Sequence, residues 1–156
     1  MLTSDDIENI RGYAIGRKDI IAIYVFGSVA TGKNRPGGDI DLAVMVAGIF
    51  SGMARVEMET ALSNLLHRDV DLVVFGQAMP LLQHQILKYG RLIYEAKPRE
   101  RILQEVGARR HYLDTTFLYK KIKMGGNGAD NGLDRAAKGK CLNAGAPQTM
   151  RETQIP

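Results

Sequence analysis

A chain of 156 residues, 45% hydrophobic and 24% charged, is long enough for one globular domain with a sizeable core and too short for two. Its longest uncharged apolar run covers only residues 20–26, far short of the about 20 residues that span a bilayer, and its acidic start lacks the pattern of a signal peptide. The single cysteine, Cys141, cannot form an internal disulfide, and a net charge of +4 does not by itself indicate nucleic-acid binding. We therefore expect a cytoplasmic protein with no membrane association and no direct binding to nucleic acid.

Periodicity and cap residues predict alternating helices and strands. Thr3 followed by Asp6 is typical of a helix start, and the β-branched and aromatic residues of 19–26 are typical of a strand buried on both faces. The elements expected in chain order are a helix at 3–15, a strand at 19–26, a turn or short helix plus a loop at 27–38, a strand at 39–46, a helix at 51–67, a strand at 69–75, a helix at 80–89, a short edge strand at 91–94 and a helix at 98–123. This order indicates the α/β class, with a small mixed β-sheet and packed helices.

Several details of these elements can be tested against a structure. Ser51 is expected to cap the helix at 51–67, and Gly90 is expected to end the helix at 80–89 in a left-handed conformation. The apolar stripe expected for the helix at 51–67 consists of Met53, Val56, Ala61, Leu62, Leu65 and Leu66. The residues of the helix at 98–123 that are expected to face the body are Ile102, Val106, Tyr112, Leu113 and Phe117.

The composition changes near the end of the last predicted helix. Residues 125–156 are rich in glycine, asparagine and alanine and contain few large apolar side chains, so they cannot bury enough surface to offset their ordering entropy. We therefore expect one folded domain at 1–123 and a flexible tail at 124–156.

Acidic residues stand at the start of two predicted strands. Residues two apart on a strand point to the same face, so Asp39 and Asp41 project together, and a divalent cation such as Mg²⁺ removes the repulsion between their carboxylates. Asp71 adds a third acid from the strand at 69–75, and three such carboxylates can bracket two metal ions. Two alternatives remain open: Asp39 and Asp41 as solvated residues at a strand start, and Asp69 as the third ligand in place of Asp71.

Gly27 and Ser28 follow directly after the strand at 19–26. A glycine here allows a sharp turn and a close approach of the backbone to a phosphate, and the next N–H groups, with the Ser28 hydroxyl, form an anion cradle. Lys33 and Arg35 lie in the loop that follows and are candidates to reach phosphate oxygens; the alternative is that both are solvated loop cations. Phosphates and metals would thus meet at one end of the same two strands.

The glycine–serine pair and the acidic strands form a known combination. The stretch 26–44, FGSVATGKNRPGGDIDLAV, follows the pattern G-S-x-A-x-G…D-x-D-L-x-V, and DVDLVV at 69–74 supplies a third acidic strand. This resembles the DNA polymerase β-type nucleotidyltransferase superfamily, most closely the minimal nucleotidyltransferases, or MNT proteins, that pair with HEPN proteins. The segment RRHYLDTTFLYKK also looks like that family's closing helix. One departure is Gly38, which stands where the family usually has serine before the first aspartate.

The resemblance implies a fold, a chemistry and a partner. The fold would be polymerase β-like, with ATP as substrate and two Mg²⁺ ions as cofactors. Asp39 and Asp41 would be metal ligands, and Asp71 a ligand and the general base for the acceptor hydroxyl. MNT proteins of this kind are antitoxins that transfer AMP from ATP to a tyrosine of an HEPN ribonuclease toxin, so we expect a hetero-oligomer with that toxin.

Two other functions stay open. One is nucleotidyl transfer to a small hydroxylated molecule, and the other is an antitoxin that neutralises its partner by contact alone. Contact does not require three aspartates, so their presence favours an enzyme.

Overall fold

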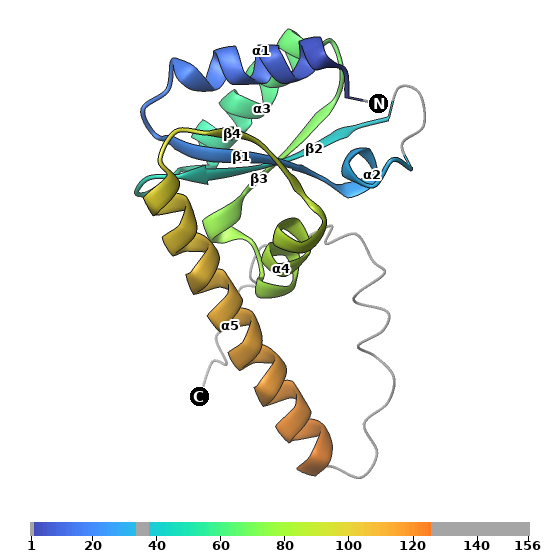
Figure 1. The fold of residues 1–156 in the computed structure, drawn as a ribbon, viewed down its shortest axis with the longest axis vertical. Coiled ribbons are helices and arrows are strands. Elements are labelled where there is room, and N and C mark those ends of the chain that lie inside the picture. The colour runs from blue at the N-terminus through green and yellow to red at the C-terminus, as the bar shows by residue number, and fades with distance from the viewer. Residues whose placement is uncertain (1, 34–37, 126–156) are drawn as a thin grey trace, which may run out of the picture. The chain divides into compact units, whose positions relative to one another are not determined.

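The computed structural model describes residues 2–33 and 38–125, which form an α/β fold with the predicted order of elements (Figure 1). The elements are α1 (Ser4–Ile15), β1 (Ile20–Phe26), α2 (Gly27–Ala30), β2 (Ile40–Val46), α3 (Gly52–Leu66), β3 (Val70–Val74), the 3-10 turn η1 (Phe75–Gln77), α4 (Pro80–Tyr89), β4 (Arg91–Glu95) and α5 (Pro98–Gly125). Each predicted helix and strand is present, and most boundaries differ from the prediction by one or two residues.

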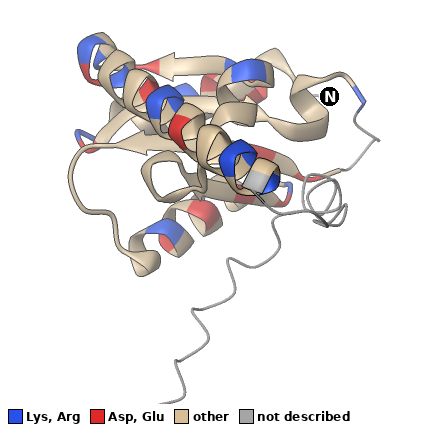
Figure 2. Cartoon of the chain, turned by 90° about the horizontal axis from the view of Figure 1, so that it is seen from below, with Lys and Arg blue, Asp and Glu red and all other residues tan. Residues whose placement is uncertain are grey.

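The four strands form one mixed sheet in the order β3-β2-β1-β4. Strand β1 runs antiparallel to both β2 and β4, whereas β2 and β3 are parallel. Helices α1 and α3 pack on one face of the sheet, and α4 and the first half of α5 pack on the other. Charged residues of both signs lie along α5 (Figure 2). The predicted small mixed sheet with packed helices is therefore confirmed.

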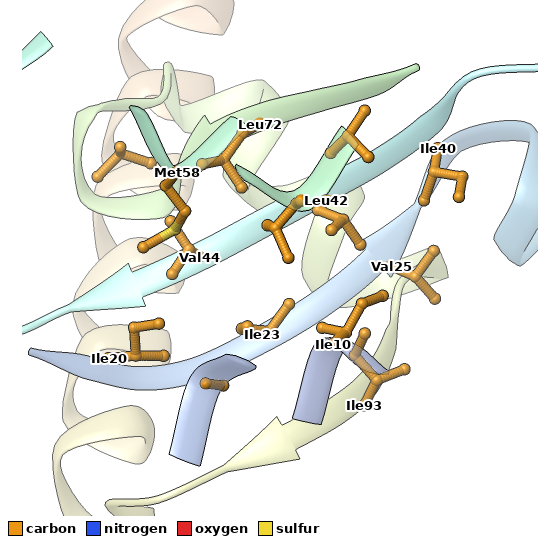
Figure 3. Packing of buried hydrophobic residues seen from close by; sticks show 14 of the residues in the cluster. Ile10, Ile20, Ile23, Val25, Ile40, Leu42, Val44, Met58, Leu72 and Ile93 are labelled. Atoms are coloured by element: carbon orange, nitrogen blue, oxygen red, sulfur yellow. The ribbon is translucent and has the colours of Figure 1, made fainter. Parts of the chain in front are cut away.

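The larger core lies between the sheet and the helices α1 and α3 (Figure 3). Side chains alternate along a strand, so Leu42 and Val44 point into this core, while Ala43 and Met45 point to the face covered by α4 and α5. All four are fully buried, which explains the continuous apolar run in the sequence of β2.

Side chains cap the N-termini of α1 and α3 as predicted. Thr3 Oγ1 accepts a hydrogen bond from the Asp6 backbone N–H at 3.1 Å, and the Asp6 carboxylate accepts one from the Thr3 N–H at 2.9 Å. Ser51 Oγ accepts from the Ala54 N–H at 3.1 Å. These bonds satisfy N–H groups that have no partner within their own helix.

The helix ends differ from the prediction. Gly90 was expected in the left-handed region, but its φ of −74° and ψ of 156° are extended. A glycine is needed there for space, because an added Cβ would lie 2.3 Å from the Ile86 carbonyl oxygen. Of the helix C-terminal caps that the structure describes, the one in the left-handed region is His67, which follows α3 with a φ of 51°.

The predicted apolar stripe of α3 was partly wrong. Met53 and Val56 are 70% and 45% exposed, whereas the buried residues are Met58, Leu62 and Leu66. These three recur every fourth residue, which places them in one row along the helix facing the sheet. The prediction missed Met58 and placed the stripe too far around the helix.

A polar row of α3 covers the outer edge of β3. Ser63 Oγ accepts from the Val70 N–H at 3.2 Å, and the Glu59 carboxylate accepts from the Leu72 N–H at 3.1 Å. The Arg55 guanidinium donates to the Leu72 carbonyl at 3.2 Å and to Glu59 at 2.7 Å. An edge strand normally offers such groups to another strand, so this row both closes the edge and holds β3 in place.

Polar side chains attach α5 to the sheet. The Tyr24 hydroxyl on β1 donates to the Glu105 carboxylate, and Arg101 donates to Glu95 on β4 at 2.7 Å and to Glu105. Burial raises the pKa of Tyr24 to about 12, and the hydrogen bond to Glu105 is the second-largest cause of this increase. One turn of α5 is therefore fixed against two strands by charged and hydroxyl groups.

The predicted body-facing side of α5 was wrong for four of its five residues. The exposed fractions are 49% for Ile102, 42% for Val106, 64% for Leu113 and 66% for Phe117. Tyr112 alone is half-buried, with its ring stacked on His84 at 3.9 Å between centroids. The inward side is occupied instead by Arg101, Gln104, Glu105 and the buried Ala108, because polar contacts rather than apolar burial join this helix to the sheet.

The residues up to Phe117 form one compact unit, and the last turns of α5, from Leu118, lie outside it. The predicted division into a domain at 1–123 and a flexible tail at 124–156 stays a prediction, since residues 126–156 lie outside the described part of the chain. Within the described residues, no helix has the length and apolar character needed to cross a membrane.

Candidate functional site

The parallel pairing of β2 and β3 brings two of the predicted acids together. Asp41 is in register with Asp71 on one side and with Phe26 on the other. Paired residues on neighbouring strands share a face and lie about 5 Å apart. Asp41 is half-buried and Asp71 is exposed, on the same sheet face as Ala43. The two carboxylates are therefore neighbours at one end of the sheet.

Asp39 and Asp69 lie just before the strands that carry this pair. β2 begins at Ile40, so Asp39 is the exposed residue that precedes it, and not its first residue as predicted. Asp69 holds the start of β2 through its backbone, since its carbonyl accepts from the Ile40 N–H at 2.9 Å. Of the two candidates for the third acid, Asp71 is the one directly opposite Asp41.

The donor set at this end of the sheet fits a metal that arrives with phosphates. Among the described residues, no three Asp, Glu, His or Cys side chains lie close enough together to hold an ion by themselves. The pair Asp41 and Asp71 offers two carboxylates on adjacent strands. Mg²⁺ is usually bound by one or two carboxylates together with substrate phosphates and water, so two acids match that mode better than a closed protein cage.

Gly27 lies directly against the Asp41 carboxylate. Its φ of +68° is in the left-handed region, which favours glycine. A Cβ added at Gly27 would lie 2.1 Å from Asp41 Oδ2, so no other residue fits without moving that carboxylate. The glycine predicted for a phosphate-binding turn thus also leaves the space that the Asp41 carboxylate occupies.

Ser28 is the second residue of the short helix α2, directly after Gly27. Its side chain is exposed, and its carbonyl accepts from the Lys33 N–H at 3.1 Å. The Thr31 hydroxyl donates to the Gly27 carbonyl at 3.2 Å, which tightens the turn. The structure therefore brings Gly27 and Ser28 to the acids and leaves Lys33 exposed on the loop, while Arg35 lies outside the described residues.

Arg68 is a positioning residue that the sequence did not reveal. Its guanidinium donates to the Gly38 carbonyl at 2.7 Å and lies 3.9 Å from the Asp6 carboxylate. It thereby holds the backbone immediately before Asp39. Thirty residues separate Arg68 from Gly38, and no local pattern indicates the contact.

A cavity of about 480 Å³ lies at the opposite end of β2 and β3. Its lining includes Val46 and Val74, which close these strands, and Gln83, Gln104 and His111 from the helices. The amide nitrogens of Gln83 and Gln104 donate to backbone carbonyls at 2.7 and 3.1 Å. The cavity is thus separate from the acids, which occupy the N-terminal ends of the two strands.

Comparison with known proteins identifies the family that the sequence motifs resemble. Residues 8–99, more than half of the chain, match the family described as "Polymerase beta, Nucleotidyltransferase". A curated relative, the protein adenylyltransferase MntA of Shewanella oneidensis, is 36% identical over 72 residues, which are 46% of this chain and 52% of the relative. The aligned region therefore spans about half the length of that relative.

Two solved structures superpose on this chain along most of their own length. A chain of a toxin–antitoxin complex with AMP-PNP is 26% identical and superposes with a TM-score of 0.67, covering 76% of this chain and 96% of that one. A chain of the tri-AMPylated Shewanella oneidensis HEPN toxin in complex with its MNT antitoxin is 25% identical with a TM-score of 0.63, covering 80% and 98%. The predicted polymerase β-like fold is confirmed, and the chain belongs to the polymerase β nucleotidyltransferase family, as a member of the MNT type.

Proposed function

We propose that this protein is a Mg²⁺-dependent adenylyltransferase that acts as an antitoxin, transferring AMP from ATP to a tyrosine of a cognate HEPN ribonuclease toxin. The observation that carries the proposal is the register of Asp41 with Asp71, next to a Gly27 that has no room for a side chain. Acids beside a glycine turn whose backbone N–H groups can bind phosphate, at one end of a sheet, suit nucleotidyl transfer.

Each site residue has a role in this chemistry. Asp41 and Asp71, with Asp39 just before β2, would hold two Mg²⁺ ions together with the triphosphate oxygens, and the ions would supply charge stabilisation there. Gly27 brings the backbone against the Asp41 carboxylate, and the backbone N–H groups of the first turn of α2 and the Ser28 hydroxyl bind phosphate oxygens there. Lys33 and Arg35 add positive charge from the loop.

Asp71 is the residue that acts on the acceptor hydroxyl. Its carboxylate is exposed, so a hydroxyl on a large partner can come within hydrogen-bond distance. Asp71 accepts the proton of that hydroxyl as its oxygen attacks the α-phosphorus and pyrophosphate leaves. A general base of this kind contributes about 10²–10⁴-fold to the rate.

The choice of AMP and of a toxin as acceptor is supported by the relatives. MntA is named a protein adenylyltransferase, and the matching complexes contain AMP-PNP in one case and an AMPylated HEPN toxin in the other. Both ATP as the substrate and the tyrosine acceptor are proposals for the present chain.

The experiment is incubation with the cognate HEPN toxin, ATP and Mg²⁺, followed by intact-protein mass spectrometry. The toxin should gain the mass of one or more AMP groups. Asp41→Asn and Asp71→Asn should lower the rate by at least about 10²-fold. Asp69→Asn is the matched control: it removes the same charge two residues from Asp71 and should leave the rate nearly unchanged.

Three outcomes would count against the proposal. Full activity of Asp71→Asn with loss in Asp69→Asn would transfer the role to Asp69. Modification that continues with EDTA in place of Mg²⁺ would remove the metal from the mechanism. Complete silencing of unmodified toxin by the Asp39, Asp41 and Asp71 triple variant would show an antitoxin that acts by contact alone.

A further inference from the structure

An apolar row runs along the outer side of α5. Ile102, Val106, Leu113 and Phe117, here called the α5 stripe, are between 42% and 66% exposed. At 100° per residue these four positions fall within about 60° of the helix circumference, and at 1.5 Å per residue they extend over about 22 Å. The spacing of four, seven and four residues is typical of a helix that packs against another helix.

The α5 stripe cannot turn inward to bury itself on this chain. The opposite side of the helix is held by the Arg101–Glu95 ion pair, the Tyr24–Glu105 hydrogen bond and the bond from Gln104 to the Val46 carbonyl. Rotating α5 would break all three contacts. The exposed apolar surface is therefore a fixed feature of the fold, and surfaces of this kind mark interaction sites.

The charges beside the α5 stripe indicate what covers it. Arg109 and Arg110 lie at the middle of its length, each about 20° outside one of its two margins on the helical wheel. Both are exposed; Arg109 reaches Glu105 only at 3.8 Å, and no ion pair is formed by Arg110 within residues 2–33 and 38–125. A partner helix with acidic residues beside its apolar face would complement this pair of cations.

A second copy of the chain does not fit this pattern. Two α5 stripes packed antiparallel about their common centre would place Arg109 and Arg110 of one copy against the same arginines of the other. A parallel pair would place Arg109 of one copy beside Arg110 of the other. Like charges facing each other across an interface oppose association, so the arginines favour a partner other than a second copy of this chain.

We propose that the α5 stripe is the docking surface for the cognate toxin, which contributes an amphipathic helix flanked by Asp or Glu. The identity of the partner rests on the proposed function. The surface belongs to a helix attached near Val46, at the far end of β2 from Asp41. None of the acids belongs to the α5 stripe, so docking and chemistry use different side chains.

The test measures toxin binding by isothermal titration calorimetry, without ATP, using the full chain and the purified cognate HEPN toxin. The double variant Leu113→Glu/Phe117→Glu should bind at least about 100-fold more weakly, because two apolar contacts are replaced by charges. Arg110→Glu should also weaken binding. Ile15→Glu is the control, since Ile15 is 72% exposed on α1 and lies on a helix of the opposite sheet face.

The variants change exposed side chains, so their melting temperatures should match that of the wild type, which separates docking from folding. Adenylyl transfer at saturating toxin is measured in parallel. Wild-type protein that binds the toxin but transfers no AMP would refute the proposed function and leave the docking result standing.

Docking itself is overturned by any of several results. These are unchanged binding by the double variant, equal loss in Ile15→Glu, or no binding by the wild type. A wild-type dimer in analytical ultracentrifugation that the double variant dissociates, with toxin binding retained, would assign the stripe to a second copy. Stronger toxin binding after removal of residues 126–156 would assign it to that segment of the chain.

Discussion

Helices α3 and α5 pack on opposite faces of the same sheet and are attached to it in opposite ways. α3 buries an apolar row of Met58, Leu62 and Leu66, and its polar row lies along the edge of β3. α5 turns polar and charged side chains inward to Tyr24 and Glu95 and leaves most of its apolar side chains outside. One helix is held chiefly by the removal of apolar surface from water, the other largely by hydrogen bonds and ion pairs.

The difference shows what a hydrophobic pattern does and does not specify. Apolar residues at helical spacing predict that a surface is to be buried, but not which molecule buries it. The apolar surface of α3 is buried against this chain's own sheet. The apolar surface of α5 stays exposed after the helix has packed on the sheet. Stability and association should therefore respond to substitutions on different helices.

The largest expected effect on stability comes from a leucine-to-alanine substitution, made once in α3 and once in α5 for comparison. Leu62 is fully buried, so Leu62→Ala should lower the free energy of unfolding by about 2–5 kcal/mol, through lost burial and the cavity left behind. Leu113 is 64% exposed, and Leu113→Ala should change it by no more than about 0.5 kcal/mol. Urea denaturation followed by circular dichroism measures both. Equal losses would mean that α5 also depends on its apolar side for folding.

A medium effect is expected for the polar row of α3. Glu59→Ala leaves the Leu72 N–H without its acceptor and should lower the free energy of unfolding by about 1–3 kcal/mol. Amide hydrogen exchange at Leu72 should accelerate in the same variant. Glu57→Ala removes the same charge from an exposed position of α3 and should do neither. Unchanged exchange at Leu72 in Glu59→Ala would show that the helix does not close this edge.

The smallest effect concerns the attachment of α5 and depends on pH. The pKa of Tyr24 is raised from 10.0 to about 12, chiefly by burial, so the folded state holds this proton more tightly than the unfolded state. Its contribution is present below pH 10 and is lost as the pH rises from 10 to about 12. Tyr24→Phe should cost about 1 kcal/mol at neutral pH and should remove this alkaline loss. Parallel stability–pH curves for the two proteins would contradict the assignment.

Much of the fold follows from local patterns in the sequence. The apolar runs, the caps at Thr3 and Ser51 and the glycine-rich turn define the elements to within a residue or two, because each depends on neighbours in the chain. The inward face of α5 could not be predicted, since polar contacts with β1 and β4 override its apolar pattern.

The candidate site shows the same limit. The spacing of Asp39 and Asp41 indicates a shared face, and the family resemblance singles out Asp71. The register that places Asp71 opposite Asp41 is a property of two paired strands, and it cannot be read from either strand alone. The contact of Arg68 with the Gly38 carbonyl joins residues with no common pattern.

In the proposed reaction, the closed edge of β3 also restricts how an acceptor reaches Asp71. Many proteins recognise extended peptides by adding them to a sheet as one more strand, which reads the peptide residue by residue. That mode needs the outward backbone groups of Val70 and Leu72, and these are already bonded to Ser63, Glu59 and Arg55. An acceptor segment must therefore present its hydroxyl without main-chain pairing. Selectivity among hydroxyl groups would then depend on which of them the proposed partner holds within reach, and the sequence around the acceptor could vary.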